Sequence, residues 1–142
     1  MKQLLTVFLF CCLSANTFAQ DIIGKWWDEE KRGQTEIYKA TTGKLYGKIV
    51  WLKVPNDPKT SKPQLDIHNK DKSKRDRPNM GMIVLLGLVE TSKGVFEGQV
   101  YNPKDGNTYS GTVTLRPDGK LKLRGYVGIS LLGKTEVWER VQ

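Results

Sequence analysis

The sequence predicts an all-β fold: a single antiparallel, up-and-down β-barrel of about eight strands, with one long loop between the third and fourth strands. Two observations lead to this fold class. Segments rich in Val, Ile, Tyr and Trp recur about every 8–12 residues and are separated by Gly, Pro, Asn and Asp. One such segment stands near each end of residues 20–142, and a closed barrel would pair these two segments and leave no exposed edge.

Each expected strand is bounded by turn residues. We expect strands at residues 22–28, 34–40, 44–54, 82–89, 94–101, 107–116, 120–128 and 134–141. Asp105-Gly106 and Pro117-Asp118-Gly119 predict hairpin turns between three of them, because glycine adopts positive φ at little cost. The run at 82–89 is apolar on both faces, so we expect it to be covered on both sides or to be briefly helical.

Two of these segments alternate strictly between apolar and polar residues. One face carries Tyr109, Gly111, Val113 and Leu115, followed by Leu121, Leu123, Gly125 and Val127. The other face is mostly polar, which indicates an antiparallel sheet with one buried and one wet side. A barrel of this size either fills its interior with side chains or holds one small ligand, and the sequence leaves both options open.

Residues 1–19 have the pattern of a secretory signal peptide. Lys2 precedes an apolar run at residues 4–13, and small or polar residues lead to Ala19. The apolar run is shorter than the roughly 20 residues that a membrane-spanning helix needs. We therefore expect cleavage after Ala19, a β-barrel domain over residues 20–142, and export to the periplasm or beyond.

The chain is basic, with 23 Lys and Arg against 15 Asp and Glu, and its formal net charge is +8. Loss of Lys2 with the signal peptide would lower that charge to +7. Such a surplus favours anionic partners at long range, so we expect weak contact with anionic membrane or polysaccharide. The same surplus also serves solubility alone, and the sequence does not fix an oligomeric state.

Tryptophan stands near both ends of the expected barrel. Gly24-x-Trp26 opens the first strand, and Trp138-x-Arg140 closes the last. This arrangement resembles the lipocalin-like (calycin) superfamily, in which a first-strand Trp plugs one barrel end and a last-strand Arg packs over it. The resemblance implies that Trp26 is the plug, Arg140 its cover by a cation–π contact, and Trp138 a structural neighbour. Two ordinary core tryptophans are the alternative.

Residues 55–80 predict a long, basic, solvent-facing loop. From Pro55 to Pro78 the chain carries four of its six prolines, seven Lys or Arg, and four Asp. Loops of this length are usually functional or disordered.

The chemistry of this loop excludes several classes of site. Oxygen ligands for Ca²⁺ are present, but the glycine and distal Glu of an EF-hand are missing, and five cations lie between Lys70 and Arg77. We therefore expect no metal and no cofactor. The loop lacks aromatic residues to stack bases, which disfavours nucleic acid. His68, the only histidine, has no nucleophile motif beside it, so we expect no catalytic residue.

Five spaced motifs cover essentially all of residues 20–142. They are Asp66-x-x-Asn69-x-Asp71; Arg77-Pro78-x-x-Gly81; Tyr101-x-Pro103-x-x-Gly106-x-x-Tyr109; Leu123-Arg124-Gly125-Tyr126-x-Gly128; and Gly133-x-x-x-x-Trp138-x-Arg140. Together they resemble the family called domain of unknown function 2147, which consists of small exported bacterial proteins. The resemblance implies a calycin-like barrel and leaves the biochemical role unassigned. Lys70 stands where that family often has proline, so the turn there departs from the pattern.

The motif residues divide into two expected roles. Turn-forming side chains and backbone-fixing residues should order the long loop: Asp66, Asn69, Asp71, Pro78 and Gly81. A polar and aromatic rim should bind a ligand at the barrel mouth: Arg77, Tyr109, Arg124 and Tyr126. The alternative for the second group is a staple that holds the loop on the barrel, with Arg77 or Arg124 paired to Asp66 or Asp71.

These observations favour non-catalytic binding of a small or amphipathic ligand at the mouth beneath the Pro55–Pro78 loop. In one version of this hypothesis the ligand is anionic, because the rim contains arginines. The alternative is an envelope structural or interaction module that binds anionic polymer or lipid head groups. A hydrolase-type enzyme is the third hypothesis.

Overall fold

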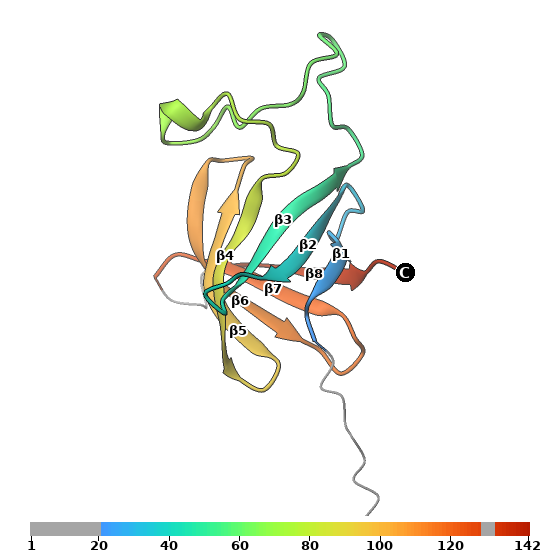
Figure 1. Ribbon diagram of the computed structural model, residues 1–142, viewed down its shortest axis with the longest axis vertical. Helices are drawn as coiled ribbons and strands as arrows, with labels where there is room; N and C mark the ends of the chain where they lie inside the picture. The colour runs from blue at the N-terminus through green and yellow to red at the C-terminus, as the bar shows by residue number, and fades with distance from the viewer. Residues whose placement is uncertain (1–20, 129–132) are drawn as a thin grey trace, which may run out of the picture.

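Eight antiparallel strands in sequence order form a closed barrel (Figure 1) in the computed structural model, which describes residues 21–128 and 133–142. The strands are β1 (Gly24–Trp27), β2 (Gly33–Lys39), β3 (Leu45–Leu52), β4 (Ile83–Ser92), β5 (Val95–Asn102), β6 (Asn107–Leu115), β7 (Leu121–Tyr126) and β8 (Lys134–Arg140). A 3₁₀ turn, η1 (Lys72–Lys74), lies in the long connection between β3 and β4. The predicted up-and-down barrel is confirmed, and strand bounds shift by at most three residues.

The apolar run at 82–89 forms part of β4, so the helical alternative is wrong. The adjacent Val84 and Leu85 are both buried, which strict alternation does not allow. The pairing of β3 with β4 shifts register between Gly47 and Lys48, and that of β4 with β5 shifts between Leu86 and Val89. Such bulges re-aim side chains and bend the sheet, and bent strands are what closure requires.

The predicted signal peptide and the export that it implies are not tested by this fold. The predicted signal peptide, residues 1–19, lies outside the described residues. Within the described ranges, no helix has the length and apolar character needed to cross a membrane.

The end of the barrel at which β1 begins and β8 ends is closed by Trp26. Its side chain is fully buried, and Arg140 lies over it, with the guanidinium carbon 4.2 Å from the ring centroid. Arg140 Nη1 donates to Ile23 O at 3.0 Å, and Nη2 donates to Asp21 O at 2.6 Å. Because Trp26 and Arg140 are also register partners across β1 and β8, the geometry supports a structural role for both.

Replacement of Arg140 by alanine should lower the free energy of unfolding by about 2–4 kcal/mol, measured by urea denaturation. The change removes a stacked cation, worth about 2 kcal/mol when desolvated, and two charge-assisted hydrogen bonds to carbonyl groups. Arg116→Ala is the matched control, since its ion pair with Asp118 is exposed and worth about 1 kcal/mol or less. Equal losses in the two variants would show that Arg140 does not hold the barrel closed.

Candidate functional site

A cavity of about 630 Å³ occupies part of the barrel interior. Its apolar wall comes from β3, β4, β5, β7 and β8, which contribute Ile49, Leu85, Val100, Leu123 and Trp138. Small-molecule sites typically have volumes of about 300–1,000 Å³ and mostly apolar walls. The barrel is therefore filled only in part, and the unfilled part has the size of a ligand site.

The rest of the interior is packed. Most of the buried apolar side chains that do not line the cavity gather toward the end closed by Trp26, among them Trp26, Ile37, Leu88, Phe96, Val113 and Leu121. The cavity instead reaches the loops that follow β1, β5 and β7, which contribute Glu30, Lys104 and Val127 to its lining. In an up-and-down barrel these loops share one end of the molecule, so the cavity opens there.

The rim of the cavity carries more carboxylates than cations. The carboxylates are Asp28, Glu29, Glu30, Asp105 and Glu136, and the cations are Arg32, Lys104 and Lys134. Among these residues, Glu136 accepts from Trp138 Nε1 at 3.1 Å and lies 3.6 Å from Lys134 Nζ, which sets a carboxylate between an indole and a lysine. The cavity lining is thus locally acidic in a chain whose formal net charge is +8.

A buried carboxylate joins the long connection to the barrel. We call residues 53–82, between β3 and β4, the arm. Asp66 of the arm is 0% exposed and accepts three side-chain hydrogen bonds: from Tyr101 Oη at 2.5 Å, Asn69 Nδ2 at 2.7 Å and Arg77 Nε at 2.9 Å. Tyr101 belongs to β5, so this cluster fixes the arm to the barrel wall. Arg77 also lies over the Tyr101 ring, 5.6 Å from its centroid.

The hydrogen bonds of this cluster set the ionisation of its members. Burial alone would raise the pKa of Asp66, but the bonds from Tyr101, Asn69 and Arg77 outweigh burial and lower that pKa below its ordinary value. Burial, with the hydrogen bond to Asp66 second, raises the pKa of Tyr101 to about 12. Asp66 is therefore a carboxylate, and Tyr101 a neutral phenol, at neutral pH.

The arm also packs on the turn between β5 and β6. Gly106 has a φ of +70°, and a Cβ there would lie 1.7 Å from the carbonyl oxygen of His68. Only glycine allows this approach of the two backbones. In the same turn, Asp105 accepts from the Tyr109 hydroxyl at 2.5 Å and from Asn107 N at 2.9 Å.

The residues predicted to order the loop all lie within the arm. Asn69 Oδ1 accepts from the backbone of Asp71, and Asp71 caps η1 by accepting from Ser73 N at 3.0 Å. Pro78 bridges to Leu65. Gly81 has a φ of +83°, and its N–H donates to Ile49 O at 2.9 Å where the chain re-enters the barrel. These contacts are the ones that a loop-ordering role requires.

Of the four predicted ligand-binding residues, Tyr109 and Tyr126 line the cavity and the two arginines do not. Arg77 forms the ion pair with Asp66, and Arg124 Nη1 donates to Thr135 Oγ1 at 2.7 Å. No arm residue lines the cavity either, so the mouth is framed by the loops after β1, β5 and β7. The ligand-binding role of Tyr109 and Tyr126 stays a prediction.

Three residues have places in the structure that the sequence did not predict, and one of them, Trp138, was expected to be a structural residue at the barrel end. Glu136 and Trp138 face the cavity, and alternation along residues 134–140 was the signal that would have placed them on one face. Tyr101 stood in a recognised motif, but its partnership with Asp66 joins residues 35 positions apart and has no local signal. The described residues hold no cluster of three or more His, Cys, Asp or Glu side chains that could bind a metal.

Replacement of Asp66 by asparagine should destabilise the protein by about 2 kcal/mol at pH 7, because an amide cannot satisfy the three donors as a carboxylate does. The pKa of Asp66 is lowered by folding, so its contribution is present above the unfolded value near 4 and is lost as pH falls through the folded value. The difference between wild type and variant in urea unfolding should therefore shrink below about pH 4.

Asp76→Asn is the control for this prediction, since it makes the same change at an exposed position of the arm. It should leave stability within about 0.5 kcal/mol of wild type. A loss for Asp66→Asn that is no greater than this, or that stays constant down to pH 2, would contradict the proposed role of the cluster.

Comparison with known proteins agrees with this architecture. A search of curated proteins gave no match. Among solved structures, the chain is similar to protein HP1028 from the human pathogen Helicobacter pylori, which is described as belonging to the lipocalin family. The TM-score is 0.72 at 26% sequence identity, and the match covers 86% of this chain and 84% of that one. A family model matches residues 24–140, and the chain therefore belongs to the family described as "Uncharacterized protein conserved in bacteria (DUF2147)".

Proposed function

We propose that this protein binds a small amphipathic ligand, without catalysis, inside its barrel. The observation that carries the proposal is the cavity of about 630 Å³, which combines an apolar interior with a charged rim at one open end. An amphipathic molecule would place its apolar part against Leu85, Val100 and Leu123 and keep its polar end nearer the charged residues of the lining. The lipocalin description of the similar H. pylori protein supports a barrel of this kind.

The charge of the rim refines the class of ligand. The hypothesis of an anionic ligand depended on Arg77 and Arg124, and neither of them lines the cavity. Five carboxylates and three cations do line it, so the local field favours a polar end that is neutral or cationic. Glu136 lies beside the Trp138 indole and 3.6 Å from Lys134 Nζ, so an ammonium group that displaces this lysine would gain an ion pair with the carboxylate and a cation–π contact with the indole.

We also propose that the protein is exported, on the signal-peptide pattern of residues 1–19. When the complete gene is expressed in a bacterial host, N-terminal sequencing of the extracytoplasmic protein should begin at Gln20. Replacing Ala19 by a bulky leucine should make the uncleaved precursor accumulate, because this cleavage site requires a small residue. Recovery of the wild-type chain in the cytoplasm, with Met1 or Lys2 at its start, would contradict export.

A cavity-filling variant tests the ligand site. Val100→Trp adds an indole inside the cavity, and it should weaken binding of the neutral fluorescent probe N-phenyl-1-naphthylamine by about tenfold or more, a loss of about 1.4 kcal/mol or more. Val89→Trp is the matched control, since Val89 is 47% exposed and lies outside the lining. Circular dichroism establishes that both variants fold. Equal probe affinity in both variants would show that the probe does not bind in the cavity.

Competition against the same probe tests the charge preference. Dodecylamine should displace the probe at a lower concentration than dodecanoate, and Glu136→Gln should reduce the difference between them. The reverse order, or an order unaffected by Glu136→Gln, would remove the cationic preference and leave the cavity proposal intact.

A further inference from the structure

The arm contains a small antiparallel ladder outside the barrel. Three segments, at residues 54–56, 63–66 and 77–80, run side by side in that spatial order. Two isolated bridges set their register: Asn56 with Pro63, and Leu65 with Pro78. Backbone hydrogen bonds from Gln64 N to Pro55 O, at 3.0 Å, and from Asp66 N to Arg77 O, at 3.0 Å, agree with that register.

This ladder is amphipathic, but its polar face is turned toward the barrel and its apolar face toward solvent, which is the reverse of the usual arrangement. Residues that stand opposite in an antiparallel pair share a face, and alternate residues along a segment share it too. The face toward the barrel is polar and carries Gln64, Asp66, Arg77 and Asn79. The face toward solvent is mostly apolar: it carries Val54, Pro63, Leu65, Pro78 and Met80, with Asn56 as its polar member. Val54 is 52% exposed, and Ile67, just beyond the ladder, is 60% exposed.

The reversal has a physical cause, because the buried Asp66 forces the polar residues inward. Asp66 reaches Tyr101 only from the inner face, and its neighbours in the alternation must follow it. The apolar side chains are then left exposed to water. Covering them would contribute a favourable free energy of roughly 25 cal/mol for each Å² buried. Contiguous exposed apolar side chains of this kind mark interaction surfaces.

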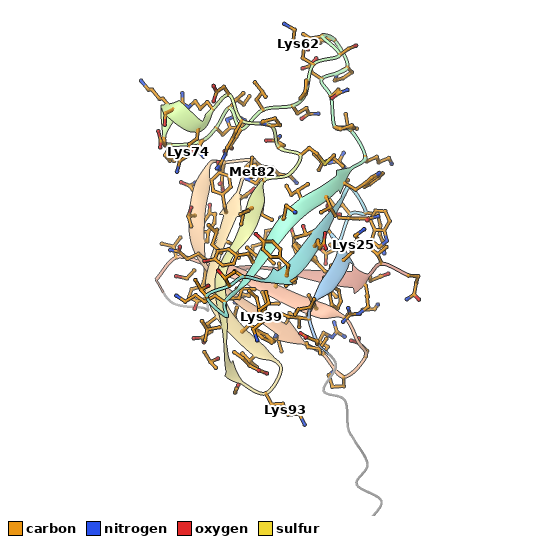
Figure 2. All side chains as sticks on the ribbon, viewed as in Figure 1. Lys25, Lys39, Lys62, Lys74, Met82 and Lys93 are labelled. Carbon is orange, nitrogen blue, oxygen red and sulfur yellow. The ribbon has the colours of Figure 1, made fainter. Side chains whose placement is uncertain are left out.

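The surroundings of this apolar face are basic. Residues 53–82 hold eight Lys and Arg against four Asp, which gives the arm a net charge of +4, half of the formal charge of the chain. Lys53, Lys59 and Lys62 adjoin the ladder. Within the described part of the arm, the ion pairs join Lys74 to Asp71 and Arg77 to Asp66, and none involves these three lysines. In Figure 2 Lys62 and Lys74 lie on the arm at one end of the molecule, and Lys93 lies at the opposite end.

We infer that the outer face of the arm docks on an anionic lipid bilayer, with its lysines at the head groups and Val54, Leu65 and Met80 at the acyl boundary. An anionic polysaccharide would use the lysines but would leave the apolar side chains uncovered. Docking on a second copy of this chain would bring together two arms that each carry a net charge of +4, and their electrostatic repulsion disfavours this contact. A bilayer surface matches both the charge and the apolar face.

Docking by this face would also orient the cavity. The arm follows β3, and the cavity opens at the loops that follow β1, β5 and β7, so the arm and the mouth share one end of the barrel. A protein held by its arm therefore has the mouth end of its barrel nearer the membrane than the end closed by Trp26. This inference goes beyond ligand binding and does not depend on it.

Vesicle flotation tests the inference. The protein should bind vesicles of equal parts phosphatidylcholine and phosphatidylglycerol and should bind phosphatidylcholine vesicles at least about tenfold less, since each surface lysine contributes about 1 kcal/mol on an anionic membrane. Two triple variants should each weaken binding to the anionic vesicles by about tenfold or more. The lysine variant is Lys53→Gln/Lys59→Gln/Lys62→Gln, and the serine variant is Val54→Ser/Leu65→Ser/Met80→Ser. All variants are compared in the same form of the chain, so residues 1–19 contribute equally to each.

The matched control is Lys39→Gln/Lys93→Gln/Val89→Ser, which changes two lysines and an exposed valine at the far end of the barrel. It should bind like wild type. Hydrogen exchange on the vesicles should show added protection at residues 54–67 and 78–80. Equal binding to neutral and anionic vesicles, or undiminished binding of the serine variant, would overturn the inference. If the wild-type protein does not bind vesicles but forms a dimer, and the serine variant is monomeric, the face would be assigned to contact with a second copy instead.

Cavity and arm can fail separately. Val100→Trp should leave vesicle binding unchanged, and the lysine variant should leave probe binding unchanged. Loss of both activities in one variant would show that the two surfaces are not independent and would overturn docking by the arm alone.

Discussion

The barrel depends on a short seam between its first and last strands. β1 is four residues long and meets β8 through two register pairs, whereas β5 and β6 share eight. Backbone pairing alone is therefore weakest at the point of closure. Arg140 reinforces this seam, because it stacks on Trp26 and donates to two carbonyl groups of the segment that enters β1. Side-chain contacts thus reinforce a closure that backbone pairing makes at only two register pairs.

Closure at that end has consequences at the other. The large side chains that fill the interior gather near Trp26, and the interior toward the opposite end stays open as the cavity. The connections that follow odd-numbered strands all emerge at the open end, so the arm and the rim of the cavity lie together there. One strand topology therefore separates a packed, stabilising end from an open end on which binding surfaces can be built.

Asp66 links the stability of the arm to the chemistry of its surface. A buried carboxylate must be hydrogen-bonded, and its three donors come from the arm itself and from β5. The same requirement turns the polar side of the arm ladder inward and its apolar side outward. The long connection is therefore ordered and carries an exposed apolar face for a single reason.

Much of this protein could be predicted from the sequence, because its strands obey local rules. Alternation with period two, spaced turn residues and the pairing of Trp26 with Arg140 depend on neighbours in the chain or on the ring that closes it. The motif residues from Asp66 to Gly81 lie in the arm and contact its backbone and side chains, and their loop-ordering role stays a prediction.

Local rules could not reveal which side of each element meets which partner. The charges of the rim come from loops far apart in sequence, and Arg77 and Arg124 resembled rim residues although they bond elsewhere. The sequence by itself determined the barrel, its strand order and its basic character, since each follows from residue pattern and count. Only the tertiary structure decided that the interior is partly open, that its lining is acidic and that the arm turns its apolar face to solvent, because these depend on contacts between distant segments.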